Sequence, residues 1–368
     1  MLARIHLLLA LVACAHAVCQ GAADCSLGGI CVGGVCVCDA AFTGPTCSRL
    51  NLLPAPTTAL WNAGNATASW GGNVVFDESD GKWHLFFAEL LDHCPLRFWG
   101  TNSVVSHATG DSPTGPYTKK ETVQPAFHHN PTVAYDPNSK TFLLVSIGNG
   151  SSSGTVPAHC NASSHDVESR LSHPVDAGVI TLSYSSSANG PWTTLARPLL
   201  RPRPGKWDFF VTNPSVHIMG NGTVLMAYRA GNASHGPNGG RTGIAVAPSW
   251  QAPFERVSDK PVYPDVNEDP GLFVDARGNF HIVSHYWKHG PGGHAFSADG
   301  RSWSFAGQAY GFEMNYTDGS SVTLKRRERP QVVSIGGEPA FLFTGAMPEH
   351  GLSRTQVQPI NRLGLGGT

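Results

Sequence analysis

The sequence predicts an all-β fold: a five-bladed β-propeller that follows a small N-terminal disulfide-rich module. Six of the nine cysteines fall between residues 19 and 47, and a strand–turn–strand unit then recurs five times. Charged residues make up only 14% of the chain, while 42 glycines and 27 prolines indicate many turns between short strands. Radial repetition of such a unit is the sequence signature of a propeller.

The first 17 residues are predicted to be a signal peptide, so that the mature chain begins at Val18. They hold a basic start, an apolar run over 7–13, and small residues at 15 and 17 that fit a cleavage site. The run is shorter than the roughly 20 apolar residues that span a bilayer, and no later stretch is long enough. We therefore expect a secreted, extracellular protein without a transmembrane segment. Six N-x-Ser/Thr glycosylation sites agree with export: Asn65, Asn149, Asn161, Asn221, Asn232 and Asn315.

Residues 18–48 form the predicted small module, in which crosslinks replace a hydrophobic core. The residues alone leave the pairing of its six cysteines open. The spacing C-x5-C-x5-C-x4-C-x-C-x8-C, with Gly44 three residues before the last cysteine, resembles the EGF-like family. No calcium is expected in the module, because Val18 stands where calcium-binding members carry acidic residues. The resemblance implies a spacer or a contact for a protein partner, and the disulfides Cys19–Cys31, Cys25–Cys36 and Cys38–Cys47.

Residues 68–368 are predicted to form the propeller, and 49–67 a linker or the strand that closes the ring. The alternative, a linear array of β-sandwiches, needs units of about 100 residues, and these repeats are shorter. The fifth repeat is cut short, so ring closure should borrow a strand from before Trp70 or from the C-terminal tail. The predicted inner strands cover 73–77, 130–136, 213–218, 269–275 and 329–333, and the strands that follow them 83–88, 142–147, 224–228, 280–285 and 341–344.

The long insertions share one position, between the second and third strands of a repeat. In an antiparallel blade these loops lie on the same rim as the starts of the inner strands. Cys94 and Cys160 lie in two such loops of adjacent blades and are expected to pair. The inner-strand starts are dense in polar residues, which are costly near an apolar axis unless they are paired or functional. We expect the functional site there, with capping of turns as the alternative for each residue taken singly.

The five-blade pattern resembles the arabinanase, levansucrase and invertase group of propeller glycosidases. The resemblance rests also on the turns Gly115-Pro-Tyr117 and Gly190-Pro-Trp192 and on Glu268-Asp-Pro270 at the start of an inner strand. Glycoside cleavage needs two carboxylates, one to protonate the leaving oxygen and one to activate water or attack. The resemblance implies Glu268 as the general acid and Asp208 as the residue that orients and tunes.

The resemblance also places a base at the start of the second inner strand, where this chain has Asn130. An asparagine cannot act as a general base. Asp269 and Glu328 are the nearest replacements, and Glu89 is a remoter one. The alternative is a non-catalytic protein that binds glycans or mediates adhesion, in which the EGF-like module presents the propeller. Glu328 with Arg329 is equally compatible with a structural ion pair.

The expected ligand is an oligo- or polysaccharide. A net charge of −1 argues against nucleic acid as a partner. No cofactor is required, and no zinc-binding histidine spacing is present. The resemblance allows an axial calcium ion, although oxygen atoms and not the imidazoles near the inner strands are its usual ligands. The residues expected to bind the substrate lie at or near the inner strands: His129, Asn130, Asn213, Arg229, His285 and Arg329.

Overall fold

The computed structural model describes residues 18–61, 67–150, 160, 179–231, 240–286 and 290–361. The predicted signal peptide and the glycosylation sites Asn65, Asn161 and Asn232 lie outside these residues. Within them, no helix combines the length and the apolar composition that crossing a membrane requires.

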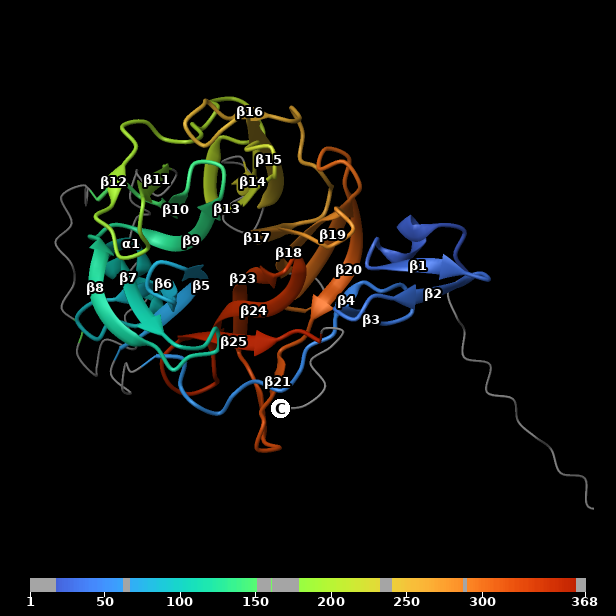
Figure 1. The fold of residues 1–368 in the computed structure, drawn as a ribbon, viewed down its shortest axis with the longest axis horizontal. Helices are drawn as coiled ribbons and strands as arrows, with labels where there is room; N and C mark the ends of the chain where they lie inside the picture. Colours follow the sequence, from blue (N-terminus) through green and yellow to red (C-terminus); the bar gives the residue numbers. More distant parts are fainter. Residues whose placement is uncertain are drawn as a thin grey trace, which may run out of the picture.

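Five antiparallel sheets surround a central axis in chain order, which confirms the predicted propeller (Figure 1). Blade one contains β5 (Ser69–Asp77), β6 (Lys82–Leu90), β7 (Ser103–Gly110) and β8 (Thr118–Gln124). Blade two contains β9 (His129–Asp136), β10 (Thr141–Ile147), β11 (Ile180–Ser185) and β12 (Thr193–Thr194). Blade three contains β13 (Phe210–Ile218), β14 (Val224–Gly231), β15 (Arg241–Ala247) and β16 (Glu255–Arg256). Blade four contains β17 (Asn267–Val274), β18 (Phe280–Tyr286), β19 (Gly292–Ser297) and β20 (Ser304–Tyr310), and blade five β23 (Arg326–Ile335), β24 (Glu338–Met347) and β25 (Arg354–Pro359).

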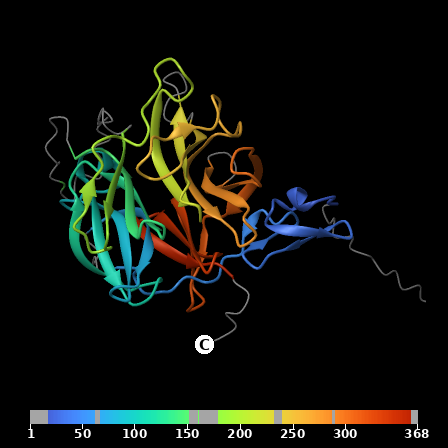
Figure 2. The same ribbon diagram turned by 45° about the horizontal axis from the view of Figure 1, so that its top comes forward.

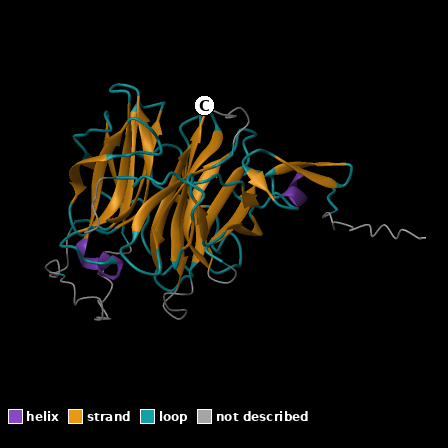
Figure 3. Ribbon diagram, turned by 90° about the horizontal axis from the view of Figure 1, so that it is seen from below, coloured by secondary structure: helices purple, strands orange, loops and turns teal. Residues whose placement is uncertain are grey.

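The hydrophobic core is divided among the spaces between neighbouring blades. One cluster joins Leu143 and Val145 of blade two to Met226 of blade three, and a second joins Ala227 of blade three to Ile282 of blade four. The middle strands of a blade are covered on both faces by the neighbouring blades; β18 is buried over its whole length. The strands run between two rims, as the side view in Figure 3 shows.

Each inner strand carries a β-bulge one to three residues after it begins. The register of all five inner strands against their partners shifts there by one residue. One residue of each bulge has a positive φ between 49° and 56°: Gly71, Asn130, Asn213, Asp269 and Arg329. A bulge redirects a side chain. The same device therefore recurs five times at the hub, on the rim that bears the long loops.

The EGF-like module lies beside blades four and five (Figure 2). It contains the short helix η1 (Ala22–Cys25) and two hairpins, β1 (Gly29–Val32) with β2 (Val35–Cys38) and β3 (Phe42–Thr43) with β4 (Arg49–Leu50). All four predicted disulfides are confirmed: Cys19–Cys31, Cys25–Cys36, Cys38–Cys47 and, between loops of blades one and two, Cys94–Cys160.

Ring closure uses both segments that the sequence suggested. The C-terminal β25 is the third strand of blade five, and Leu52 forms an antiparallel bridge with Ile360 just beyond it. The chain then passes the hairpin of β21 (Glu313–Asn315) and β22 (Ser321–Thr323) before it reaches blade one. The remaining helices, η2 (Leu96–Phe98) and α1 (Trp99–Asn102), lie in the long loop of blade one.

Candidate active site

The five bulge residues form a ring around the axis, which we call the hub ring: Gly71, Asn130, Asn213, Asp269 and Arg329. The Asn130 amide donates to Asn213 Oδ1 (2.9 Å), and the Asn213 amide donates to Asp269 Oδ1 (2.5 Å). Arg329 then donates through Nη1 to Asp269 Oδ1 (3.3 Å). Gly71 completes the ring, because a Cβ there would lie 2.9 Å from the Cβ of Arg329. The side chains of the hub ring thus bind one another.

Arg329 reaches across the hub, since its Nη2 donates to the backbone oxygen of Asn130 in blade two (3.2 Å). Only 1% of Arg329 and 3% of Asp269 is exposed. A built-in cation therefore lies beside the axis. This arrangement does not fit the axial calcium ion considered from the sequence, because a cation there would meet the guanidinium group of Arg329. Asp269, held by Arg329 and Asn213, is also not available as a free catalytic base.

A second set of charged residues lies next to the hub ring, and we call it the hub cluster: Glu268, Glu328, His285, Arg229 and Arg326. Nδ1 of His285 lies 3.1 Å from Oε1 of Glu268, and its Nε2 lies 3.9 Å from Oε1 of Glu328. Arg229 contacts the other oxygen of Glu268 at 2.8 Å. Arg326 binds both oxygens of Glu328, at 2.7 Å each. One imidazole therefore joins two carboxylates that come from adjacent inner strands.

The charges of the hub cluster favour a protonated His285. Burial opposes the charged imidazole, but the hydrogen bond with Glu268 and the nearby charges of Glu328, Glu268 and Asp269 outweigh it, so that the pKa of His285 is raised above its ordinary value. Two arginines and an imidazolium then face two carboxylates. The hub cluster is consequently balanced or slightly positive.

The two carboxylates of the hub cluster are close together. Glu268, Glu328, His285 and Asp269 each offer one polar atom that lies within 4.8 Å of the others. The side chains of Glu268, His285 and Glu328 are 11%, 9% and 6% exposed, whereas that of Arg326 is 41% exposed. This spacing is short enough for a pair that acts on one bond. The ion pairs of Glu268 and Glu328 with arginine are also compatible with a site that binds a ligand without catalysis.

The structure does not bring Asp208 to the hub cluster. Asp208 is fully buried, and its carboxylate binds Nε of Arg203 (2.9 Å) and Nε of Arg256, which lies on the outermost strand of blade three. Those contacts direct it toward the outer edge of the blade and not toward Glu268. Glu89 is likewise held elsewhere, by Lys119 at 2.6 Å and by the hydroxyl of Ser106.

The remaining predicted residues divide between the two sets. Asn130, Asn213 and Arg329 belong to the hub ring, whereas Arg229 and His285 belong to the hub cluster. His129 lies near them: its Nδ1 is 2.6 Å from the hydroxyl of Ser103. Burial, together with the charge of Arg329, holds the pKa of His129 well below its usual range, so this imidazole is neutral.

Arg326 is the residue of the hub cluster that sequence reasoning did not single out. The charge-dense run from Arg326 to Arg329, in a chain with few charges, could have indicated it.

A cavity of about 340 Å³ lies away from the hub, between 56–61, the β21–β22 hairpin and the start of β25.

Comparison with known proteins supports the two-part architecture. Residues 19–47 match the EGF-like domain family. No curated protein sequence matches the chain. The fold is similar to that of a family 117 glycoside hydrolase from the marine bacterium Zobellia galactanivorans (TM-score 0.59, 13% identity, 89% of this chain and 94% of that one).

Two further glycosidases have a similar fold. One is an exo-β-1,3-galactanase from Phanerochaete chrysosporium, solved with galactose (TM-score 0.54, 12% identity, 84% of this chain and 64% of that one). The other is the catalytic domain of a family 62 α-L-arabinofuranosidase from Coprinopsis cinerea (TM-score 0.55, 10% identity, 85% and 96%). At these identities the likeness shows the propeller fold alone.

Proposed function

We propose that this chain is a secreted glycoside hydrolase that acts on extracellular oligo- or polysaccharides at the hub cluster. The observation that carries the proposal is the pair of carboxylates, Glu268 and Glu328, held on either side of His285 at the rim with the long loops. A carbohydrate-active role agrees with structural neighbours that are glycoside hydrolases of the same fold.

In the proposed reaction Glu268 protonates the glycosidic oxygen, and Glu328 activates water or attacks the anomeric carbon. Where Glu328 acts as a base, the proton that it takes from water can return to Glu268 through His285, whose two ring nitrogens face the two carboxylates. His285 is then a positioning and proton-carrying residue. Because its pKa is raised, the imidazolium bridge persists above the usual histidine range and is lost as the pH rises through the folded-state pKa.

The second candidate function is glycan binding without cleavage. Two observations favour it: Arg229 and Arg326 each neutralise one of the two carboxylates, and Asn130 stands where the resemblance places a base. A carboxylate held by an arginine is stabilised in its ionised form, which opposes the role of an acid. In this alternative the hub cluster would hold a sugar through fixed donors and acceptors.

Export and glycosylation are part of the proposal. Asn149, Asn221 and Asn315 are exposed, as an attached glycan requires. A protein partner of the EGF-like module also stays a prediction. The surface open to it includes aliphatic side chains of the β1–β2 hairpin that are between 38% and 53% exposed: Ile30, Val32, Val35 and Val37.

The test is a release and binding screen of the full secreted chain on β-1,3-galactan, arabinan and other extracellular polysaccharides. Glu268→Gln and Glu328→Gln should each lower sugar release by about 100-fold or more while glycan binding is retained. Glu338→Gln is the matched control, because Glu338 is exposed at the start of β24, on the opposite rim. Unchanged release in both hub variants would contradict catalysis at the hub cluster, and binding without release by the wild type would favour the second function.

A further inference from the structure

At the rim opposite the hub cluster, consecutive blades are joined by a recurring contact. The turn after an inner strand, or the strand that follows it, touches the outer turn of the next blade, between its third and fourth strands. This contact is present from blade one to two, two to three and three to four: Ala188 N–H donates to Asp77 (2.9 Å), Trp250 Nε1 donates to Ser139 (3.1 Å), and Gly300 packs against Leu225.

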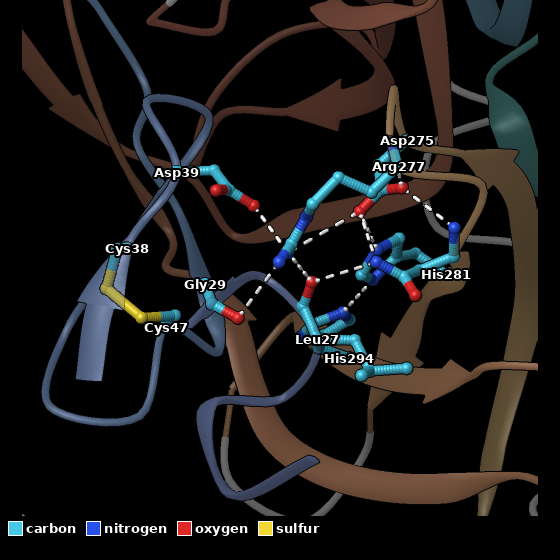
Figure 4. A network of polar contacts seen from close by, with 10 residues as sticks. Leu27, Gly29, Cys38, Asp39, Cys47, Asp275, Arg277, His281 and His294 are labelled. Atoms are coloured by element: carbon cyan, nitrogen blue, oxygen red, sulfur yellow. Dashed lines mark hydrogen bonds and ion pairs between the residues drawn. A yellow bond between two sulfur atoms is a disulfide. The ribbon is translucent and has the colours of Figure 1, made fainter. Parts of the chain in front are cut away.

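Among the described residues, the sheet of blade five has three strands and no outer turn, so the same contact with blade four is not present there. The EGF-like module lies there instead. Arg277, in the turn after the inner strand of blade four, donates to the carboxylate of Asp39 (2.6 Å) and to the backbone oxygens of Gly29 (3.2 Å) and Leu27. Figure 4 shows this guanidinium group between the module and blade four.

The segment that follows the module supplies the missing strand position of blade five. Leu53 N–H donates to the oxygen of Pro359, and Asn361 N–H donates to the oxygen of Asn51, both at 2.8 Å. With the bridge between Leu52 and Ile360, these bonds extend the sheet β23–β24–β25 on its outer side. The C-terminal end of the edge strand β25 is thereby paired.

The module and the two blades also share one hydrophobic cluster. Phe42 and Leu50 of the module are 3% and 5% exposed, and they belong to the same cluster as Phe273 of blade four and Leu342 and Ile360 of blade five. The ring of Phe42 lies 5.0 Å from the ring of His281 in blade four. The contact is therefore a continuation of the propeller core and not the polar contact of a loosely tethered domain.

We infer that the EGF-like module has a structural function in this chain: it completes blade five of the propeller. The module and its trailing segment take the place of the fourth strand and outer turn of blade five. Neighbouring blades cover one another in a propeller, and the module covers the part of blade four that blade five leaves open. The module is accordingly part of one cooperative unit with blades four and five.

Thermal unfolding of the full secreted chain, followed by calorimetry and tryptophan fluorescence, tests this inference. Arg277→Ala should lower the midpoint of the propeller transition by about 5 °C, because charge-assisted bonds to the module are lost. Arg277→Lys should fall between Arg277→Ala and the wild type, since lysine keeps the charge but cannot bind three acceptors in a fork. The wild type should unfold in a single transition.

Arg301→Ala is the matched control, since Arg301 is an exposed arginine of another blade-four turn, and its midpoint should not change. Hydrogen exchange gives a second measurement on the same variants. In Arg277→Ala the amides of β25 and of 51–53 should exchange faster, while the amides of β13 keep their protection. Separate transitions for module and propeller, or an unchanged propeller midpoint in Arg277→Ala, would overturn the inference.

Discussion

Blades one and four contain the same device, an aspartate followed by two buried histidines, but they cover it differently. In blade one, Asp80 lies 3.2 Å from Nε2 of His84, and Nδ1 of His84 lies 2.8 Å from Nε2 of His107. In blade four, Asp275 lies 3.3 Å from Nε2 of His281, whose Nδ1 lies 3.0 Å from Nε2 of His294. The histidines occupy equivalent positions in the two sheets.

The hydrogen bonds assign the tautomers of both pairs. An aspartate can only accept, so the first histidine donates from Nε2 and its Nδ1 accepts from Nε2 of the second histidine. The second histidine of each pair is neutral, as burial requires. Burial lowers the pKa of His107 to about 4 and holds that of His294 well below its usual range.

The two blades differ in the residue that lies on the histidine pair. In blade one, Phe86 of the same blade stacks on His107 at 4.8 Å, and Trp192 of blade two meets Phe86 edge-on. In blade four, the ring lying on both histidines is Phe42 of the EGF-like module, 5.0 Å and 5.6 Å away. The module therefore occupies, next to blade four, the position that blade two occupies next to blade one.

The largest loss of stability is expected from the hub ring, to which blades one and four each contribute a residue. Arg329→Leu leaves the carboxylate of Asp269 buried without its cation, so the free energy of unfolding should fall by about 3–5 kcal/mol. Denaturant unfolding of the full chain measures it. The double variant Arg329→Leu, Asp269→Leu should recover part of the loss. A loss below about 1 kcal/mol in the single variant would show that the hub ring does not hold the blades.

Removal of the aromatic ring that covers a histidine pair should lower the free energy of unfolding more in blade four than in blade one. Phe42→Ala deletes the buried ring that lies on both histidines of the blade-four pair, and should cost about 3 kcal/mol. Trp192→Ala in blade two should cost less, about 1 kcal/mol, because Trp192 is only partly buried and Phe86 still covers His107. Equal losses in the two variants would contradict the idea that the module replaces a blade.

A smaller effect is expected from pH. His107, His281 and His294 have folded-state pKa values below the ordinary 6.5, so their contribution to stability is complete above pH 6.5 and is lost as the pH falls toward the folded-state pKa. For His107, a pKa of about 4 corresponds to a loss of about 2 kcal/mol at pH 5. Urea unfolding at a series of pH values measures it. His107→Gln should flatten the profile, and an unchanged slope would refute this origin.

Much of the fold could be predicted from local patterns. The cysteine spacing led to all three disulfides of the EGF-like module, and alternating apolar strands with Gly- and Pro-rich turns led to five blades. The repeated dipeptides Asn130-Pro, Asn213-Pro, Asp269-Pro and Arg329-Pro coincide with the bulges. These features depend on residues close together in the chain, so the sequence expresses them directly.

The candidate site could be predicted only in part. Glu268 and Glu328 lie at inner-strand starts, as predicted, whereas His285 and Arg229 lie beside them on second strands. Their ion-pair partners could not be predicted, because a carboxylate pairs with an arginine that is close in space but far away in the sequence. Asp208 went to Arg256 on an outer strand, and Asp269 went to Arg329 across sixty positions of the chain.

By itself the sequence determined the crosslinked module, the number of blades and the rim at which polar side chains converge, since each follows from composition or short-range spacing. Only the tertiary structure decided which carboxylates remain together at the hub and what completes blade five. The reason is that the pairing of buried charges and the covering of a sheet edge depend on close packing between distant segments, which local propensity does not predict.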